Sequence, residues 1–175
     1  MKPIHVTVIA LLALTIAPAW AAAPVLHVTK SETIDASASK VWDAVKNFDG
    51  LNTWHPALAK DEIVEGKNNH VGAVRLLTLK DGGTIKEKLL AYDSAHRSMH
   101  YSILEGVLPF SHYSSTISVK SAGKNKAKVT WSGSFKRKNT GENPSDKEND
   151  KAATDTATAV YTGGLDNLKK MLEAK

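Results

Sequence analysis

Six segments between residues 60 and 138 have the composition of β-strands, and short connections join them. The expected strands are Lys60 to Glu65, Val71 to Lys80, Thr84 to Tyr92, Ser98 to Glu105, Tyr113 to Ser121 and Ala127 to Lys138. Connections this short join antiparallel neighbours, because a parallel pair needs a crossover of about a dozen residues or more. An antiparallel sheet with one polar face needs a cover over its apolar face. The sequence therefore predicts a meander that another part of the chain must cover.

The cover is expected from one long helix near the C-terminus, which follows a polar loop over residues 139–149. This helix is predicted to start at Ser145 or Asp146. Its expected apolar stripe consists of Val160, Gly164, Leu168 and either Met171 or Leu172. These elements predict an α+β helix-grip fold, in which a curved antiparallel sheet wraps around the long C-terminal helix.

The part of the chain before the meander adds one strand and two short helices. Residues 25–34 alternate between apolar and polar side chains, which predicts a strand. A helix capped by Asp35 or Ser37 is expected to run to about Phe48. A second short helix is expected over residues 51–54.

The first residues have the features of a secretory signal peptide. An apolar run over residues 6–17 follows Lys2, and Ala19-Trp20-Ala21 matches a small-x-small cleavage site. We expect cleavage after this triplet, so that residues 1–21 are the signal peptide and residues 22–175 form a single domain. The alternative is a membrane anchor, but a membrane span needs about 20 apolar residues and this run is shorter. The sequence therefore predicts a secreted, periplasmic protein with no membrane span after cleavage.

Composition excludes several kinds of site and partner. The chain has no cysteine, which excludes disulfides and thiolate-bound zinc or iron–sulfur sites. Its histidines lack metal-ligand spacing, and no P-loop or Gly-x-Ser-x-Gly elbow is present, so no metal and no cofactor is expected. The net charge of +5 falls to +4 without Lys2. Because the lysines are scattered, we expect no nucleic-acid partner, whereas an acidic periplasmic protein would fit.

The predicted hairpin around Asp81-Gly82-Gly83 can be phased from its turn. If these three residues form the loop, Lys80 faces Thr84, and odd-numbered residues of both strands share one face. Lys86 and Lys88 lie on the other face and mark it as exposed to water. The odd face, which then points inward, holds Arg75, Leu77, Leu79, Ile85, Glu87 and Leu89.

Arg75 and Glu87 are the most informative residues of this inward face, where they are expected to lie diagonally on adjacent strands. A buried charge is very costly without a partner, and even a buried ion pair is weak evidence for stability. One interpretation is a polar anchor for a ligand's carboxylate, carbonyl or hydroxyl group. The other is a salt bridge that fixes the strand register. The residues leave both interpretations open.

The later strands and the long helix contribute further candidates. The expected inward positions are Tyr101, Ile103, Tyr113 and Ser115, and a tyrosine suits a pocket wall because its apolar ring ends in a polar tip. For the last strand, either Val129, Trp131 and Phe135 or the intervening Thr and Ser residues point inward. Each glycine of Gly163-Gly164 costs up to about 1 kcal/mol relative to alanine in a helix. The pair therefore indicates either close packing against the sheet or room for a cavity.

Several short stretches along the chain carry a resemblance to a known superfamily. They are Val41 to Val45, Phe48 to Gly50, Trp54 to Pro56, Val71 to Arg75, Glu87 to Leu89 and Tyr92-Asp93. In order and spacing they resemble the SRPBCC (Bet v 1/START-like) superfamily, in its polyketide cyclase/dehydrase-like branch, over nearly the whole chain after the leader. The resemblance implies a pocket for a small apolar or amphipathic molecule between the sheet and the long helix.

Two groups within this superfamily add detail to the expectation. Similarity to the plant abscisic acid receptors implies a polar pocket network that includes Arg75 and Glu87, with pocket positions at Tyr101, Tyr113 and Ser115. It also implies rim loops at residues 81–83 and 105–110, although the gate and latch motifs of those receptors are absent here. In size and secretion the chain resembles the small periplasmic accessory proteins of bacterial methanol oxidation, which implies docking on a periplasmic redox enzyme.

Three hypotheses of function result. The first is binding of a small apolar or amphipathic ligand, the second is docking on a periplasmic enzyme, and the third is a cyclase- or hydrolase-type enzyme with Glu87 and His55 as acid and base. The candidate ligand-binding residues are Trp54, His55, Arg75, Leu77, Glu87, Leu89, Tyr101, Ile103, Leu108, Tyr113, Ser115, Tyr161, Gly164 and Leu165.

Overall fold

The computed structural model describes residues 23–174, so the predicted signal peptide and its cleavage site lie outside the described residues. The elements are β1 (Leu26–Ile34), α1 (Ala38–Val45), the single-turn 3-10 helix η1 (Leu51–Thr53), β2 (Leu58–Glu65), β3 (Val74–Leu79), β4 (Thr84–Asp93), β5 (Ser98–Gly106), β6 (Phe110–Gly123), β7 (Lys126–Arg137) and α2 (Asp150–Glu173). Within residues 23–174, no helix combines the length and the apolar composition that a membrane span requires.

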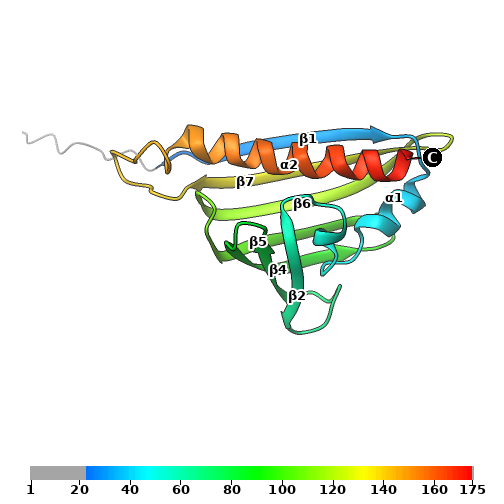
Figure 1. Ribbon diagram of the computed structural model, residues 1–175, viewed down its shortest axis with the longest axis horizontal. Helices are drawn as coiled ribbons and strands as arrows, with labels where there is room; N and C mark the ends of the chain where they lie inside the picture. The colour runs from blue at the N-terminus through cyan, green and yellow to red at the C-terminus, as the bar shows by residue number, and fades with distance from the viewer. Residues whose placement is uncertain (1–22, 175) are drawn as a thin grey trace, which may run out of the picture.

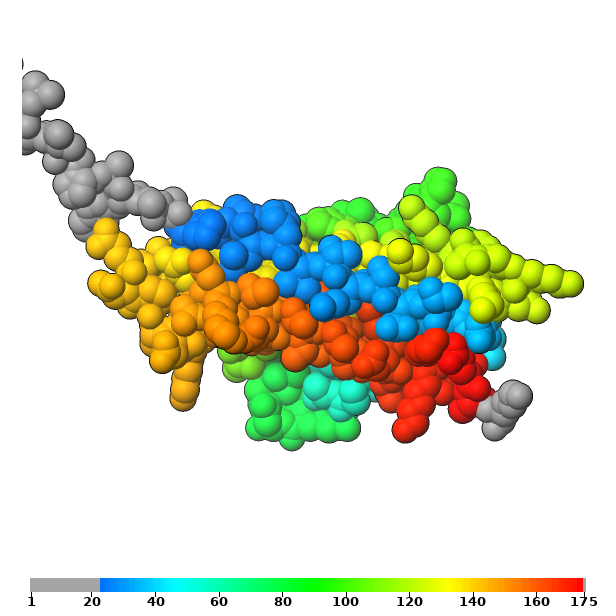
Figure 2. Space-filling view, turned by 90° about the horizontal axis from the view of Figure 1, so that it is seen from above, coloured from blue at the N-terminus to red at the C-terminus, as the bar shows by residue number. Residues whose placement is uncertain are grey.

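The seven strands form one antiparallel sheet in the order β1-β7-β6-β5-β4-β3-β2. Figure 1 shows α2 lying along β1 and β7, while the strands from β6 to β2 curve away beneath it. Seen from above in Figure 2, α2 runs beside β1 along the length of the molecule. The helix thus covers the inner face of the curved sheet. This arrangement confirms the predicted α+β helix-grip fold, with the two short helices after the first strand.

The short helix α1 ends three residues earlier than predicted. The Ser37 hydroxyl accepts the Lys40 backbone N–H at 3.2 Å and caps the helix. After Val45 the chain turns, and the Phe48 side chain becomes fully buried. The Asn69 side-chain oxygen accepts the Phe48 backbone N–H at 2.8 Å. This bond replaces the one that a continuing helix would have made.

The long helix α2 begins at Asp150, later than the predicted start at Ser145 or Asp146. The Asn149 side chain accepts the Ala152 backbone N–H at 2.8 Å and so caps the helix. The residues just before this cap form a separate turn instead of the first turn of the helix.

The predicted apolar stripe of α2 is also wrong in part. Met171 is 46% exposed, and Val160 and Leu172 are only half-buried. The buried face instead consists of Ala153, Ala157, Tyr161, Gly164, Leu165 and Leu168. Small alanine side chains let the helix approach the sheet closely, and a search for large apolar residues does not identify them.

The hairpin of β3 and β4 keeps the predicted faces, but its turn is shifted. The Leu79 N–H donates to the Gly83 carbonyl at 2.8 Å, so the three-residue loop lies one residue earlier than predicted. Gly82 turns the chain with a φ of +90°, which glycine adopts without strain. Arg75 therefore lies directly opposite Glu87 instead of diagonal to it. Pairing moves by two residues, and because side chains alternate with a period of two, the odd face still points inward.

The inward face of β7 is the apolar one, which settles the alternative that the sequence left open. Val129, Trp131 and Phe135 are each no more than 2% exposed. Trp131 stacks on Tyr161 of α2 at a centroid distance of 4.6 Å and meets the Trp54 ring edge-on at 5.6 Å. These aromatic contacts join the sheet, η1 and α2 into one core.

The two adjacent glycines of α2 lie in different surroundings. A Cβ atom on Gly164 would lie 2.7 Å from His55 and 3.0 Å from Trp131, whereas nothing lies within 4 Å of a Cβ on Gly163. Close packing, and not an open cavity, therefore accounts for Gly164.

We expect the two alanine substitutions to change stability in opposite directions. Gly163→Ala should raise the free energy of unfolding by up to about 1 kcal/mol, because alanine favours the helix. Gly164→Ala should lower it, because overpacking costs about 1–3 kcal/mol and exceeds the gain in propensity. Urea denaturation of both variants beside the unaltered protein measures the difference. A stabilised Gly164→Ala variant would contradict the packing described here.

Candidate ligand-binding cavity and buried charge cluster

A small cavity of about 50 Å³ lies inside the fold, between the inner face of the sheet, the η1–β2 segment and α2. Of the candidate residues, those that line it are His55, Leu77, Glu87, Tyr101, Ile103, Leu108, Tyr113 and Tyr161. The lining residues that the sequence did not single out as candidates are Leu51, Ala57, Leu58, Leu79, Ile85, Phe110, Trp131 and Val160. Most of the wall is apolar, so the cavity suits an apolar molecule.

The other candidate residues lie outside the cavity lining. Trp54, Leu89 and Leu165 belong to the hydrophobic core. Arg75 and Ser115 are buried in hydrogen-bond networks, and Gly164 packs against the Trp54, His55 and Trp131 rings. These six residues pack against the lining side chains or hydrogen-bond to them, and so hold them in position.

A second and larger cavity of about 230 Å³ adjoins the first where β5 and β6 separate. Pairing between these strands stops at Ser102 and Ser114, and beyond this point the two strands diverge. Four side chains line both cavities and form the wall between them, namely Ile103, Leu108, Phe110 and Tyr113. Leu108 belongs to the loop between the two strands, so this wall includes the part of the chain that the sequence marked as a rim loop.

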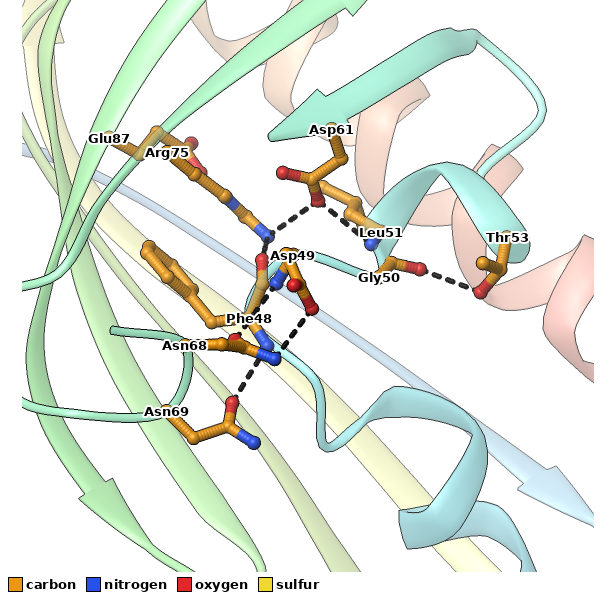
Figure 3. A network of polar contacts seen from close by, with 10 residues as sticks. All are labelled: Phe48, Asp49, Gly50, Leu51, Thr53, Asp61, Asn68, Asn69, Arg75 and Glu87. Atoms are coloured by element: carbon orange, nitrogen blue, oxygen red, sulfur yellow. Dashed lines mark hydrogen bonds and ion pairs between the residues drawn. The ribbon is translucent and has the colours of Figure 1, made fainter. Parts of the chain in front are cut away.

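Arg75 is the centre of a buried charge cluster next to the cavity (Figure 3). Its Nε and Nη2 atoms both donate to Glu87 Oε2, at 2.8 and 2.5 Å. Its Nη1 donates to the Phe48 carbonyl and, at 3.3 Å, to Asp61 Oδ2. The side chains of Arg75, Glu87 and Asp61 are 2%, 6% and 0% exposed. One guanidinium thus joins β3, β4, β2 and the segment after α1.

Aromatic rings complete the surroundings of the guanidinium. Its carbon lies 4.3 Å from the centroid of the Phe48 ring and 5.2 Å from that of the Tyr101 ring. Cation–π contacts of this kind are stronger where water is excluded. Because Arg75 donates to three residues and is enclosed by two rings, it acts as a structural cation, and Glu87 is the member of the cluster that borders the cavity.

Burial changes the proton affinity of both acids in the cluster. It raises the pKa of Asp61 to about 6, although Arg75 and the Leu51 backbone N–H lower it in part. Burial also raises the pKa of Glu87, and Arg75 offsets only part of that effect. For Arg75, burial lowers the pKa, but the attraction of Glu87 and Asp61 is larger and the net pKa is raised. The guanidinium therefore stays charged while the acids titrate closer to neutrality.

Asp61 belongs to the charge cluster but was not among the site residues predicted from the sequence. Asp61 accepts the Leu51 backbone N–H at 2.9 Å and so ties η1 to β2. Its predicted strand alternated weakly, and its phase relative to β3 was unknown. In the β2–β3 register Asp61 lies opposite Leu77, which faces inward. Knowledge of this register would have placed Asp61 on the inner face.

A chain of hydroxyl groups also borders the cavity. The Tyr113 and Tyr161 oxygens are 2.7 Å apart, and the Tyr161 oxygen is 3.3 Å from Ser115 Oγ. Ser115 donates to the Ser132 carbonyl at 3.0 Å and accepts the Trp131 indole N–H at 2.9 Å. Burial raises the pKa of both tyrosines, so they stay neutral hydrogen-bonding groups.

Both ring nitrogens of His55 are occupied by backbone groups. The Val160 carbonyl lies 3.0 Å from Nε2 and can only accept, so Nε2 carries the proton. The Ala57 N–H donates to Nδ1 at 3.3 Å. Burial lowers the pKa of His55, in agreement with a neutral ring. In this arrangement neither nitrogen is free to act as an acid or base on a ligand.

The raised pKa of Asp61 predicts a specific pH dependence of stability. Between about pH 4 and pH 6 the folded protein holds more protons on Asp61 than the unfolded chain does, so the stability contributed by the protonated form is lost as pH rises through this range. The total change is up to about 3 kcal/mol. The difference in unfolding free energy between the unaltered protein and Asp61→Asn should therefore decrease from pH 4 to pH 6.5.

Urea denaturation at several pH values measures this difference. Glu62→Gln, on the same strand but exposed, controls for the loss of one negative charge. A difference between the unaltered protein and Asp61→Asn that does not vary with pH would show that Asp61 is not shifted.

Comparisons with known proteins agree with this fold. A family model described as polyketide cyclase / dehydrase and lipid transport matches residues 25–173. An uncharacterised protein from Bacillus thuringiensis is 31% identical over 85% of this chain and all of its own, with a TM-score of 0.74. The protein XoxI from Bacillus cereus is 31% identical over 83% of this chain and 94% of its own, with a TM-score of 0.73.

A more distant structure shares the fold alone. The ZhuI aromatase/cyclase from Streptomyces sp. R1128 is 20% identical, covers 86% of this chain and 94% of its own, and has a TM-score of 0.67. The family match extends over nearly all of the described residues and confirms the resemblance found in the sequence. The chain therefore belongs to the polyketide cyclase/dehydrase and lipid transport family.

Proposed function

We propose that the protein is a secreted, periplasmic binder of one small apolar or amphipathic molecule, held between the sheet and α2. The observation that supports this function best is the apolar cavity bordered by a single buried carboxylate, Glu87. Membership in a family described by cyclase, dehydrase and lipid transport fits the same use of the fold. Secretion is supported by the features of residues 1–21.

The size of the cavity sets a condition on binding. Ligand pockets usually have about 300–1,000 Å³, whereas this cavity has about 50 Å³ and could hold a few water molecules. The adjoining cavity of about 230 Å³ lies behind Leu108 and Phe110. Movement of these two side chains would join the cavities, so we infer that the β5–β6 loop moves when a ligand enters.

Enzymatic activity has less support from the site. The acid–base pair considered from the sequence consisted of Glu87 and His55, but His55 uses both nitrogens within the fold. Glu87 alone could still polarise a ligand. Binding without turnover is therefore the function that the geometry supports best. Docking on an acidic periplasmic partner or redox enzyme stays a prediction from the sequence.

A cavity-filling substitution tests the proposed function. Leu108→Trp places a larger side chain in the wall between the cavities and should weaken the binding of naphthalene, an uncharged apolar probe, by about tenfold or more. Such a loss corresponds to about 1.4 kcal/mol, the scale of two buried methylene groups. Leu90→Trp, at a position that is 40% exposed and outside both cavities, is the matched control.

Isothermal titration calorimetry of the three proteins measures the dissociation constants. Equal affinity of the Leu108→Trp and Leu90→Trp variants for naphthalene would contradict binding in this cavity. Failure of the unaltered protein to bind any apolar probe would contradict the proposed function itself.

A further inference from the structure

The hydrogen-bonding groups that face the cavity restrict the chemistry of its ligand, an inference that rests on the proposed function. Glu87 borders the cavity, and both bonds from Arg75 go to its Oε2 atom. Among residues 23–174, no group donates a hydrogen bond to Glu87 Oε1. This oxygen is not among the fully buried unpaired side-chain atoms of these residues, which are Trp54 Nε1 and Asp61 Oδ1, so it is open to the cavity. The cavity therefore presents one strong, unused acceptor.

The hydroxyl chain of Ser115, Tyr161 and Tyr113 has a preferred direction. Ser115 donates to the Ser132 carbonyl, so its oxygen can only accept from Tyr161 and Trp131. When the Tyr161 proton points to Ser115, Tyr161 accepts from Tyr113. This arrangement makes every bond of the chain and leaves the Tyr113 oxygen with lone pairs only. Tyr113, which lines the cavity, then offers a second acceptor.

The position of Tyr161 in this chain is fixed by the sheet beneath it. A Cβ atom on Gly133 of β7 would lie 2.0 Å from the Tyr161 hydroxyl oxygen, so only glycine leaves space for that oxygen. The Tyr161 ring is held by stacking on Trp131. The acceptor at Tyr113 is therefore a built feature of the site.

The other polar side chains of the lining add only one free donor. His55 is engaged with backbone groups at both nitrogens. Tyr101 lines the cavity close to Ser115, whose oxygen already accepts from Tyr161 and Trp131 and whose proton goes to the Ser132 carbonyl. The Tyr101 hydroxyl is thus the group that can donate to a ligand oxygen.

Charge excludes two other kinds of ligand group. The cluster combines one guanidinium with two carboxylates, Glu87 and Asp61, and Arg75 does not line the cavity. A ligand carboxylate would be repelled by the negative charge of Glu87, and no cationic side chain of residues 23–174 lines the cavity to compensate it. An ammonium group would have to lose its hydration in a mainly apolar cavity. Glu87 would compensate only part of this cost, because its charge is already paired with Arg75.

We propose that the cavity selects neutral apolar molecules that carry a hydroxyl group, either an alcohol or a phenol. The ligand hydroxyl donates its proton to Glu87 Oε1 or to the Tyr113 oxygen and accepts from Tyr101. A single hydroxyl satisfies a donor and an acceptor at once. A ketone or ether satisfies only Tyr101 and leaves the carboxylate oxygen of Glu87 unpaired.

A series of probes on one carbon skeleton tests this selection. Calorimetry compares 2-naphthol with 2-methoxynaphthalene, 2-naphthoate and 2-naphthylmethylamine on the unaltered protein. A hydrogen bond to a charged group contributes about 1.5–3 kcal/mol, so 2-naphthol should bind at least about tenfold more tightly than its methyl ether. The carboxylate and the amine should bind more weakly than 2-naphthol.

Glu87→Gln should reduce the preference for 2-naphthol over the ether to about threefold or less. In this variant the positive charge of Arg75 is still paired with the negative charge of Asp61. Glu62→Gln, at an exposed glutamate outside both cavities, should keep the full preference. The probe series on the unaltered protein decides the matter even if Glu87→Gln does not fold. Equal binding of the ether, or tightest binding of the carboxylate or amine, overturns the inference but leaves the proposed function standing. No binding by any naphthalene probe overturns the proposed function.

Discussion

The buried guanidinium of Arg75 is the interaction on which the inner half of this fold depends. It contacts Glu87, Asp61 and the Phe48 carbonyl, which belong to three separate segments of the chain. A buried charge tolerates few alternative arrangements, since any loss of a partner leaves an uncompensated ion. The cluster therefore fixes how β2 and the η1 segment sit against the sheet. The side chains that form the cavity are held in place by this arrangement.

The same cluster gives the cavity its polarity. Two acids share one cation, and only Glu87 reaches the cavity wall. Elsewhere in the site, a glycine in β7 admits the Tyr161 hydroxyl and so sets the direction of the tyrosine pair. An apolar space with acceptors at its polar end is suited to a neutral molecule with a proton to donate. Selectivity thus arises from groups that also stabilise the fold.

Much of the fold could be predicted from sequence, because alternation along strands has a period of two. The β3–β4 turn was placed one residue too late, yet Arg75 and Glu87 were still assigned to the inner face, since the error moved the pairing by two residues. Asp61 was missed because its role depends on a pairing between strands that the chain's own pattern does not specify. The buried face of α2 was misplaced because alanines such as Ala153 and Ala157 carry little hydrophobic signal. The small volume of the cavity depends on how the lining side chains pack, which no residue pattern encodes.

Locating a bound probe by NMR tests the central claim most directly. Intermolecular nuclear Overhauser effects between 2-naphthol and the methyl groups of the protein report which side chains the ligand touches. The account predicts contacts to Leu77, Ile103 and Leu108, which line the space beside Glu87. Contacts confined to exposed methyl groups such as those of Val71 and Leu90 would contradict it, because the ligand would then lie on the surface and outside the fold's interior.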